Sequence, residues 1–151
     1  MSDLETLRKV LDELEWEPEQ DESVSGFHID FGPPHFPVAT GFAAVAEDTN
    51  DFIFYINFGM NVAPADRETL MQSITRLNWG LTIGNFELNL DDGHLRFKSS
   101  VAYGGAGLSE ALICNVIERA MSAVEAYGAE LMSAIGAWPE EDGSVVDNNA
   151  S

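Results

Sequence analysis

Three histidines and one cysteine are the side chains of this sequence that most often bind metal ions. His28, His35 and His94 form neither H-x₃-H nor H-E-x-x-H, and Cys114 does not partner them at zinc spacing. Cys114 lies in an apolar helical stretch, where a small buried cysteine is unreactive. We therefore expect surface histidines, no metal site and no cysteine nucleophile.

Carboxylates are abundant, and two clusters resemble cation sites at first sight. Asp91-Asp92 and Glu140-Glu141-Asp142 both lack the D-x-D-x-D-G…E spacing of a calcium loop. Paired-acid hydrolysis needs two carboxylates fixed across a cleft, and 26 acidic residues produce close pairs by chance. The glycine-rich stretch 104–107 fits neither the phosphate-loop nor the dinucleotide pattern. We predict no catalytic residue, no cofactor and no enzymatic activity.

The charge excludes further classes of function. Among 151 residues, 7 are basic and 26 acidic, which gives a formal net charge of −19. Such a field repels phosphate backbones and anionic lipid surfaces, so neither nucleic acid nor a membrane is an expected partner. The hydrophobic fraction of 45% is enough for a folded core. A single cysteine, no apolar run of membrane-spanning length and no secretory pattern at the N-terminus indicate a cytoplasmic protein.

Hydrophobic periodicity predicts the elements that must position any site. Apolar residues at helical spacing predict helices over about 4–17, 64–79 and 109–131. Alternation predicts strands over 27–31, 52–58, 86–90 and 95–101, and residues 38–47, which are small and apolar on both faces, predict a further strand. Ser2 with Glu5 has the spacing of a capping box, and Ser109 precedes the last helix as a cap. The order α-β-β-β-α-β-β-α predicts an α+β fold, an antiparallel sheet with helices packed on one face.

The fourth and fifth strands should form a hairpin, because Asp92-Gly93 separates two alternating apolar runs. A two-residue loop at that point would pair Leu90 with Leu95, Leu88 with Phe97 and Glu87 with Lys98. The alternation slips at Gly84-Asn85, which predicts a bulge.

Two residues near the end of the second helix carry their own predictions. Gly80 is placed as the glycine that follows the helix. Asn78 should hydrogen-bond to backbone at the junction between helix and strand, a structural role. The alternative for Asn78 is contact with a partner or ligand.

Several short motifs in Leu70–Leu131 occur together. They are Leu77-Asn78, Leu81, Gly84-Asn85-Phe86-Glu87-Leu88, Asp91-Asp92-Gly93 and Gly107-Leu108-Ser109 before a long helix. With these motifs the chain resembles the YbjN domain family, which shares the fold of the type III secretion chaperones. The resemblance spans most of residues 4–135 and implies a non-enzymatic domain, often labelled a bacterial sensory transduction regulator. The secretion chaperones are likewise small, acidic and usually dimeric. The Gly-Pro-Pro-His segment at 32–35 and the acidic tail depart from the family.

Residues 1–138 are expected to form one domain, and residues 139–151 an acidic, disordered tail. The tail holds four acids and no base. A frayed end that aids solubility is the simpler interpretation, and a functional acidic arm is the alternative.

These observations lead us to expect a protein-binding module, regulatory or chaperone-like. A dedicated type III secretion chaperone, and a small-ligand binder or enzyme, are the alternatives. Ile53 and Tyr55 lie on the face of the third strand opposite its phenylalanines, and Trp79 and Trp138 stand beyond helix ends, so these four are the candidate partner-binding residues. The partner is an unknown protein or a second copy in a homodimer. The alternative is a monomer in which helix ends or the tail cover Ile53 and Tyr55.

Overall fold

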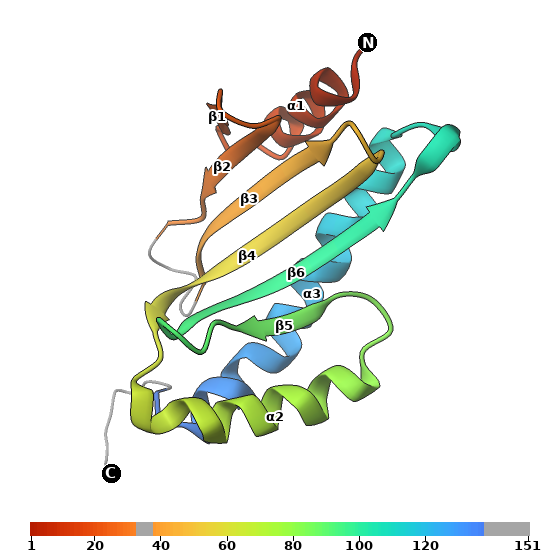
Figure 1. Cartoon of the computed structure of the whole chain (residues 1–151). Helices are drawn as coiled ribbons and strands as arrows, with labels where there is room; N and C mark the ends of the chain where they lie inside the picture. Colours follow the sequence, from red (N-terminus) through yellow and green to blue (C-terminus); the bar gives the residue numbers. More distant parts are fainter. Residues whose placement is uncertain (33–37, 138–151) are drawn as a thin grey trace.

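The computed structural model describes residues 1–32 and 38–137 (Figure 1). In chain order the elements are α1 (Asp3–Glu13), β1 (Glu19–Asp21), β2 (Gly26–Asp30), β3 (Val38–Ala46), β4 (Asp51–Asn61), η2 (Pro64–Asp66), α2 (Arg67–Gly80), β5 (Asn85–Leu88), β6 (His94–Ala102), η3 (Gly104–Ala106) and α3 (Glu110–Ala134). All strand pairs are antiparallel, and the six strands lie in the order β1-β2-β3-β4-β6-β5.

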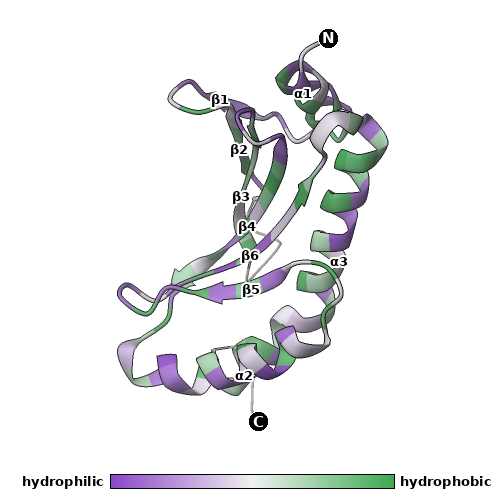
Figure 2. Cartoon of the chain, turned by 45° about the vertical axis from the view of Figure 1, so that its right-hand side comes forward, coloured by the Kyte–Doolittle hydropathy of each residue, from purple (hydrophilic) through white to green (hydrophobic). Residues whose placement is uncertain are grey.

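The helices lie on one side of this sheet (Figure 2). α3 packs against β4 and β6, α1 contacts β3 and α3, and α2 runs beside β5 and contacts α3. The predicted α+β class, with helices over one face of an antiparallel sheet, is therefore confirmed.

The core is built by alternation along the strands, as β4 shows most clearly. Phe52, Phe54, Ile56 and Phe58 are all buried toward the helices, which confirms the predicted face. Complete burial of a side chain of this size stabilises the fold by about 1.5–3 kcal/mol. Because the side chains of a strand alternate, the residues between them must lie on the opposite face.

Both predicted helix caps are present. The Ser2 hydroxyl accepts a hydrogen bond from the backbone N–H of Glu5, and the Glu5 carboxylate accepts one from the N–H of Ser2, which completes a capping box. The Ser109 hydroxyl accepts from the N–H of Leu112 at the start of α3.

The predicted hairpin register is wrong by two residues. Phe86 pairs with Phe97, Glu87 with Arg96 and Leu88 with Leu95. The loop is longer than Asp92-Gly93, because the side chains of Asn89 and Asp92 accept hydrogen bonds from backbone N–H groups within it. An even shift keeps each side chain on its predicted face, so Leu88 and Phe97 still share the core side.

Three smaller expectations also change. The structure adds β1, a polar three-residue strand that no apolar alternation reveals. Gly80 is the last residue of α2 rather than the residue after it. The expected bulge at Gly84-Asn85 is instead the end of the loop between α2 and β5, with Gly84 at φ 75°.

Candidate functional site

The face of the sheet opposite the helices, the outer face, carries half-buried side chains. At its centre lie Phe42 on β3, Ile53 and Tyr55 on β4, and Arg96 and Lys98 on β6. The strand register places Tyr55 directly between Phe42 and Lys98. The residues that alternate with the core thus form a continuous surface of aromatic and cationic groups.

Three of these side chains, together with His28 on β2, contact one another in a row across the strands. We call His28, Phe42, Tyr55 and Arg96 the outer-face row. The ring centroids of His28 and Phe42 are 4.8 Å apart, and those of Phe42 and Tyr55 are 6.4 Å apart with the ring planes 26° from parallel. The Arg96 Cζ atom lies 4.2 Å from the centroid of the Tyr55 ring, within the range of a cation–π interaction.

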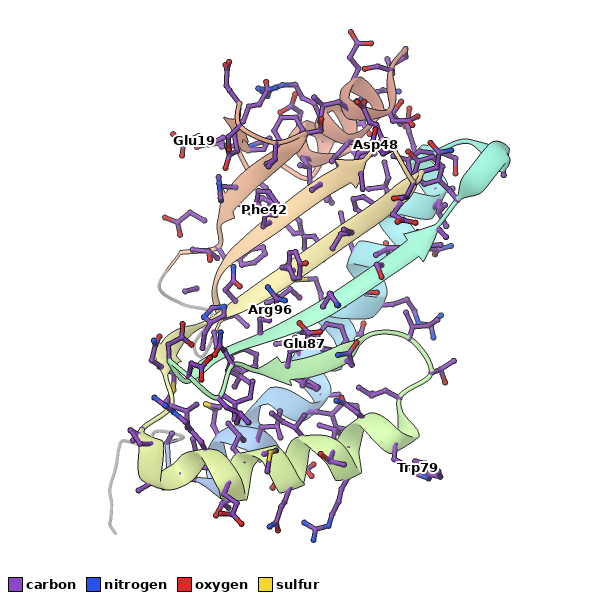
Figure 3. The ribbon with its side chains drawn as sticks, viewed as in Figure 1. Glu19, Phe42, Asp48, Trp79, Glu87 and Arg96 are labelled. Carbon is purple, nitrogen blue, oxygen red and sulfur yellow. The ribbon has the colours of Figure 1, made fainter. Side chains whose placement is uncertain are left out.

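A carboxylate fixes one end of the outer-face row. The Glu87 carboxylate accepts a hydrogen bond from Arg96 Nε at 2.7 Å and lies 3.1 Å from Lys98 Nζ. Figure 3 shows Phe42, Arg96 and Glu87 following one another across the sheet. Partial burial acts to raise the pKa of Glu87, but the hydrogen bonds from Arg96 and Lys98 outweigh it and hold the pKa below its ordinary value. The Glu87 carboxylate therefore orients both Arg96 and Lys98 on the outer face.

A second carboxylate fixes the other end of the row. Asp21 Oδ2 lies 2.9 Å from His28 Nε2, and Asp21 Oδ1 accepts hydrogen bonds from the hydroxyl and the N–H of Ser23. The Ser23 hydroxyl and then His28 lower the pKa of Asp21 to about 2. Both ends of the row are thus held by ionised carboxylates.

A glycine lets the outer-face row lie flat on the sheet. A Cβ atom at Gly26 on β2 would lie 2.7 Å from Cζ of the Phe42 ring, closer than real Cβ contacts. The Phe42 ring therefore packs directly over the backbone of its neighbouring strand.

Beside Arg96 the surface forms a hollow of about 470 Å³, lined by Glu87, Leu88, Asn89, His94 and Arg96. The imidazole Nε2 of His94 lies 3.1 Å from Asn57 Oδ1, so Asn57 orients the ring of His94. Arg96 makes its one side-chain hydrogen bond to the described residues through Nε, which leaves its two terminal nitrogens available to an acceptor in the hollow.

The structure separates the predicted partner-binding residues. Ile53 and Tyr55 lie on the outer face, in the paired positions between Ala44 and Ser100 and between Phe42 and Lys98, respectively. Trp79 stands at the end of α2, points away from the sheet in Figure 3 and is 93% exposed. Trp138 lies outside the described residues. The candidates that remain therefore form two surfaces rather than one.

Sequence reasoning missed Phe42, Arg96 and Lys98 as parts of the site. Arg96 was missed because its contact with Tyr55 depends on the pairing of β4 with β6, for which the sequence indicates no register: Arg96 pairs with Asn57 and its guanidinium lies over the Tyr55 ring. The alternation of β6 places Arg96 and Lys98 on the polar face, which is the signal that could have identified them.

Asn78 takes the predicted structural role. Its Oδ1 accepts from the N–H of Phe86 at 2.9 Å, and its Nδ2 donates to the carbonyl of Phe86 at 3.0 Å. These are the two hydrogen bonds that a neighbouring strand would make, so Asn78 joins α2 to the edge of β5.

Several negative findings concern the part of the chain that the structure describes. Within residues 1–32 and 38–137, no three His, Cys, Asp or Glu side chains come together as metal ligands, and no helix has the length and apolar character to cross a membrane. Burial, with nearby Glu118 and Glu110, raises the pKa of the Cys114 thiol, which disfavours the reactive thiolate. His35 lies outside the described residues.

Comparison with solved structures shows the fold. The chain is 17% identical to YbjN of E. coli, whose crystal structure is titled "a putative transcription regulator", with a TM-score of 0.60 over 84% of this chain and 92% of that chain. A chain of the ExsC–ExsE complex gives 9% identity and a TM-score of 0.60 over 82% and 89%. An uncharacterized protein from Methanothermobacter thermautotrophicus is 12% identical in sequence, with a TM-score of 0.61 over 89% of this chain and 100% of that chain. These likenesses confirm the predicted type III secretion chaperone-like fold.

Comparison by sequence gives a family. No curated protein matches the chain. Residues 3–132 match the YbjN family, which is described as "Putative bacterial sensory transduction regulator". Since this match covers most of the chain and agrees with the fold, the protein belongs to the YbjN family.

Proposed function

We propose that this chain is a non-enzymatic protein-binding module, regulatory or chaperone-like, and that the outer face is its recognition surface. The observation that carries the proposal is the outer-face row, in which Phe42, Tyr55 and Arg96 stack in contact on a face that no described helix covers. Aromatic and arginine side chains are the types most enriched where proteins bind proteins, because they combine apolar area with a polar group.

The chemistry of this face favours a protein over other partners. Aromatic platforms on sheets also bind single-stranded nucleic acid, but a net charge of −19 repels its phosphates. A small-ligand binder or enzyme, the alternative that the sequence leaves open, would need an enclosed pocket with converging polar groups. The hollow beside Arg96 lies open on the surface along the β5–β6 hairpin.

Family and fold support a regulatory or chaperone-like role. The family description names a regulator, and one structural neighbour comes from a complex of two proteins, ExsC and ExsE. A dedicated type III secretion chaperone is the narrower form of this proposal, and a gene for a secreted effector beside that of this chain would favour it. We place the activity in the cytoplasm, because a single cysteine suits a reducing compartment.

A capture experiment with matched variants tests the proposal. The chain is immobilised as wild type, as Tyr55→Glu and as Ser122→Glu, which adds the same charge at an exposed position on α3. We expect lysate of the source organism to yield a protein that wild type and Ser122→Glu retain and that Tyr55→Glu loses. Equal retention by all three would remove the outer face from recognition.

A second copy of the chain is the other partner that this face could take. Light scattering over a concentration series up to about 100 μM covers the weak end of specific association. A homodimer through the outer face predicts a mass that rises above 16.5 kDa with concentration and returns to it in Tyr55→Glu. A constant 16.5 kDa for both proteins would exclude the homodimer.

A further inference from the structure

The sequence after the described residues is acidic, and it is connected to the end of α3. Residues 139–151 hold four acids and no base. Gly128 on α3 lies beside the Phe58 ring near the end of β4, so the last turns of α3 run toward the end of the sheet where β4 ends and β6 begins (Figure 1). The described part of the chain therefore ends on the side of the molecule that carries the hairpin with His94 and Arg96.

The same end of the outer face carries the hollow beside Arg96. Its lining includes the guanidinium of Arg96 and the imidazole of His94. The terminal nitrogens of Arg96 make no hydrogen bond to the described residues and can donate to both oxygens of one carboxylate. Glu87 already pairs with Arg96 Nε and with Lys98. These three side chains together carry one net positive charge, which a further carboxylate would meet.

This cationic position is unusual in a chain with seven basic residues, two of which, Arg96 and Lys98, lie side by side on the outer face of β6. On the three central strands, Asp51 at the start of β4 is the acid on this face. At physiological salt the screening length is about 8 Å. A single carboxylate seated at Arg96 is therefore affected mainly by the side chains beside it, whereas a phosphate backbone extends beyond the hollow and meets the acidic surface around it. Asp91 and Asp92 lie in the loop of the same hairpin, so the attraction for a carboxylate comes from direct hydrogen bonds to the terminal nitrogens of Arg96 rather than from a net positive charge of the region.

We propose that the acidic segment 139–151 docks through its carboxylates in the hollow beside Arg96 of the same chain. Fully extended, residues 138–151 span roughly 45 Å, while packed layers lie about 10 Å apart, so the segment can pass around the end of the sheet. The contact is electrostatic and partly exposed, and salt therefore weakens it. It stands apart from the proposed function, because it is measured without any partner.

Paramagnetic broadening in the full chain tests this contact. A nitroxide attached at Ser144→Cys, in a Cys114→Ser background, should weaken the amide signals of Glu87, Leu88 and His94–Lys98 and leave those of α1 unchanged. The broadening should fall when salt shortens the screening length from roughly 14 to 4 Å. Uniform broadening, or none on the outer face, would overturn the proposal; in the second case the hollow awaits a partner.

Matched variants separate the docked segment from other causes. Replacing Glu140 and Glu141 with Gln and Asp142 with Asn leaves the folded core untouched and should abolish the local broadening. Arg96→Gln should abolish it as well, whereas Arg76→Gln on α2 should not. A mixture of isotope-labelled chains without nitroxide and spin-labelled chains without isotope detects contact between molecules. Broadening in that mixture would assign the hollow to a second copy and contradict docking within the chain.

Discussion

The two faces of the sheet use the same strands in opposite ways. On the helix side, Phe54 of β4 and Phe97 of β6 are fully buried. On the outer face, Tyr55 and Lys98, their neighbours in sequence, are half-buried and interact with charged or aromatic groups. Successive residues of one strand thus have different roles: one packs in the core and stabilises the fold, and the next lies on the face that can recognise a partner.

Polar groups show the difference most clearly. On the outer face, Glu87, Asn57 and Asp21 all have hydrogen-bond partners. On the helix side, the buried Ser99 hydroxyl has none among the described residues. The outer face is therefore organised by polar contacts, and the helix side by apolar packing.

The largest effect should come from the helix side. Phe97→Ala should lower the free energy of unfolding by about 3–5 kcal/mol, because it leaves a cavity against Phe86. Phe42→Ala on the outer face should cost clearly less, since solvent already reaches that ring. Urea denaturation of both variants gives the two values. Equal losses would mean that the two faces do not differ as described.

The next effect concerns the connection between α2 and the sheet. Asn78→Ala leaves the N–H and the carbonyl of Phe86 without partners and should lower the free energy of unfolding by about 1–3 kcal/mol. Thr75→Ala on the exposed side of α2 is the control and should change it by less than about 0.5 kcal/mol. Unchanged melting of Asn78→Ala together with loss of a captured partner would instead assign Asn78 to binding.

Ser99 offers a change in the opposite direction. Ser99→Ala removes a buried hydroxyl without a partner and should raise the free energy of unfolding by about 1 kcal/mol. Thermal denaturation of the variant and wild type measures it. A lower melting temperature would show that the hydroxyl makes a stabilising hydrogen bond.

The smallest effect should be the pH dependence of the outer face. Because hydrogen bonds hold the pKa of Glu87 below its ordinary value of 4.5, its contribution is present above about pH 4.5 and is lost as the pH falls through the lower folded pKa. Glu87→Gln should therefore cost about 0.2–1 kcal/mol at pH 7 and less as the pH falls below 4.5. Urea titrations at several pH values would contradict this if the difference grew in acid.

Much of the helix side followed from the sequence, because burial leaves a periodic pattern. The alternation of Phe52, Phe54, Ile56 and Phe58 predicted the core face of β4, and Ser109 predicted the start of α3. The role of Asn78 was also predicted, since an asparagine at a helix end has few other partners within reach.

The outer face was harder to predict, because its contacts depend on register. The loop from Asn89 to Gly93 is closed by side-chain hydrogen bonds that the Asp-Gly signal does not show. The resulting shift of two residues keeps the faces but changes every pair between β5 and β6. The stacking of Arg96 on Tyr55 was missed because it depends on the pairing of β4 with β6, which no turn signal in the sequence reveals. β1 was missed because Glu19–Asp21 has no apolar residue.

The most direct test of the outer face as a recognition surface is site-specific photo-crosslinking in cells of the source organism. A photoreactive residue replaces Tyr55 on the outer face, Trp79 on the exposed end of α2, or Ser122 on α3. We expect a discrete protein crosslink from position 55 and none from position 122, and position 79 reports whether α2 adds a second contact. Crosslinks from position 79 with none from position 55 would contradict this expectation.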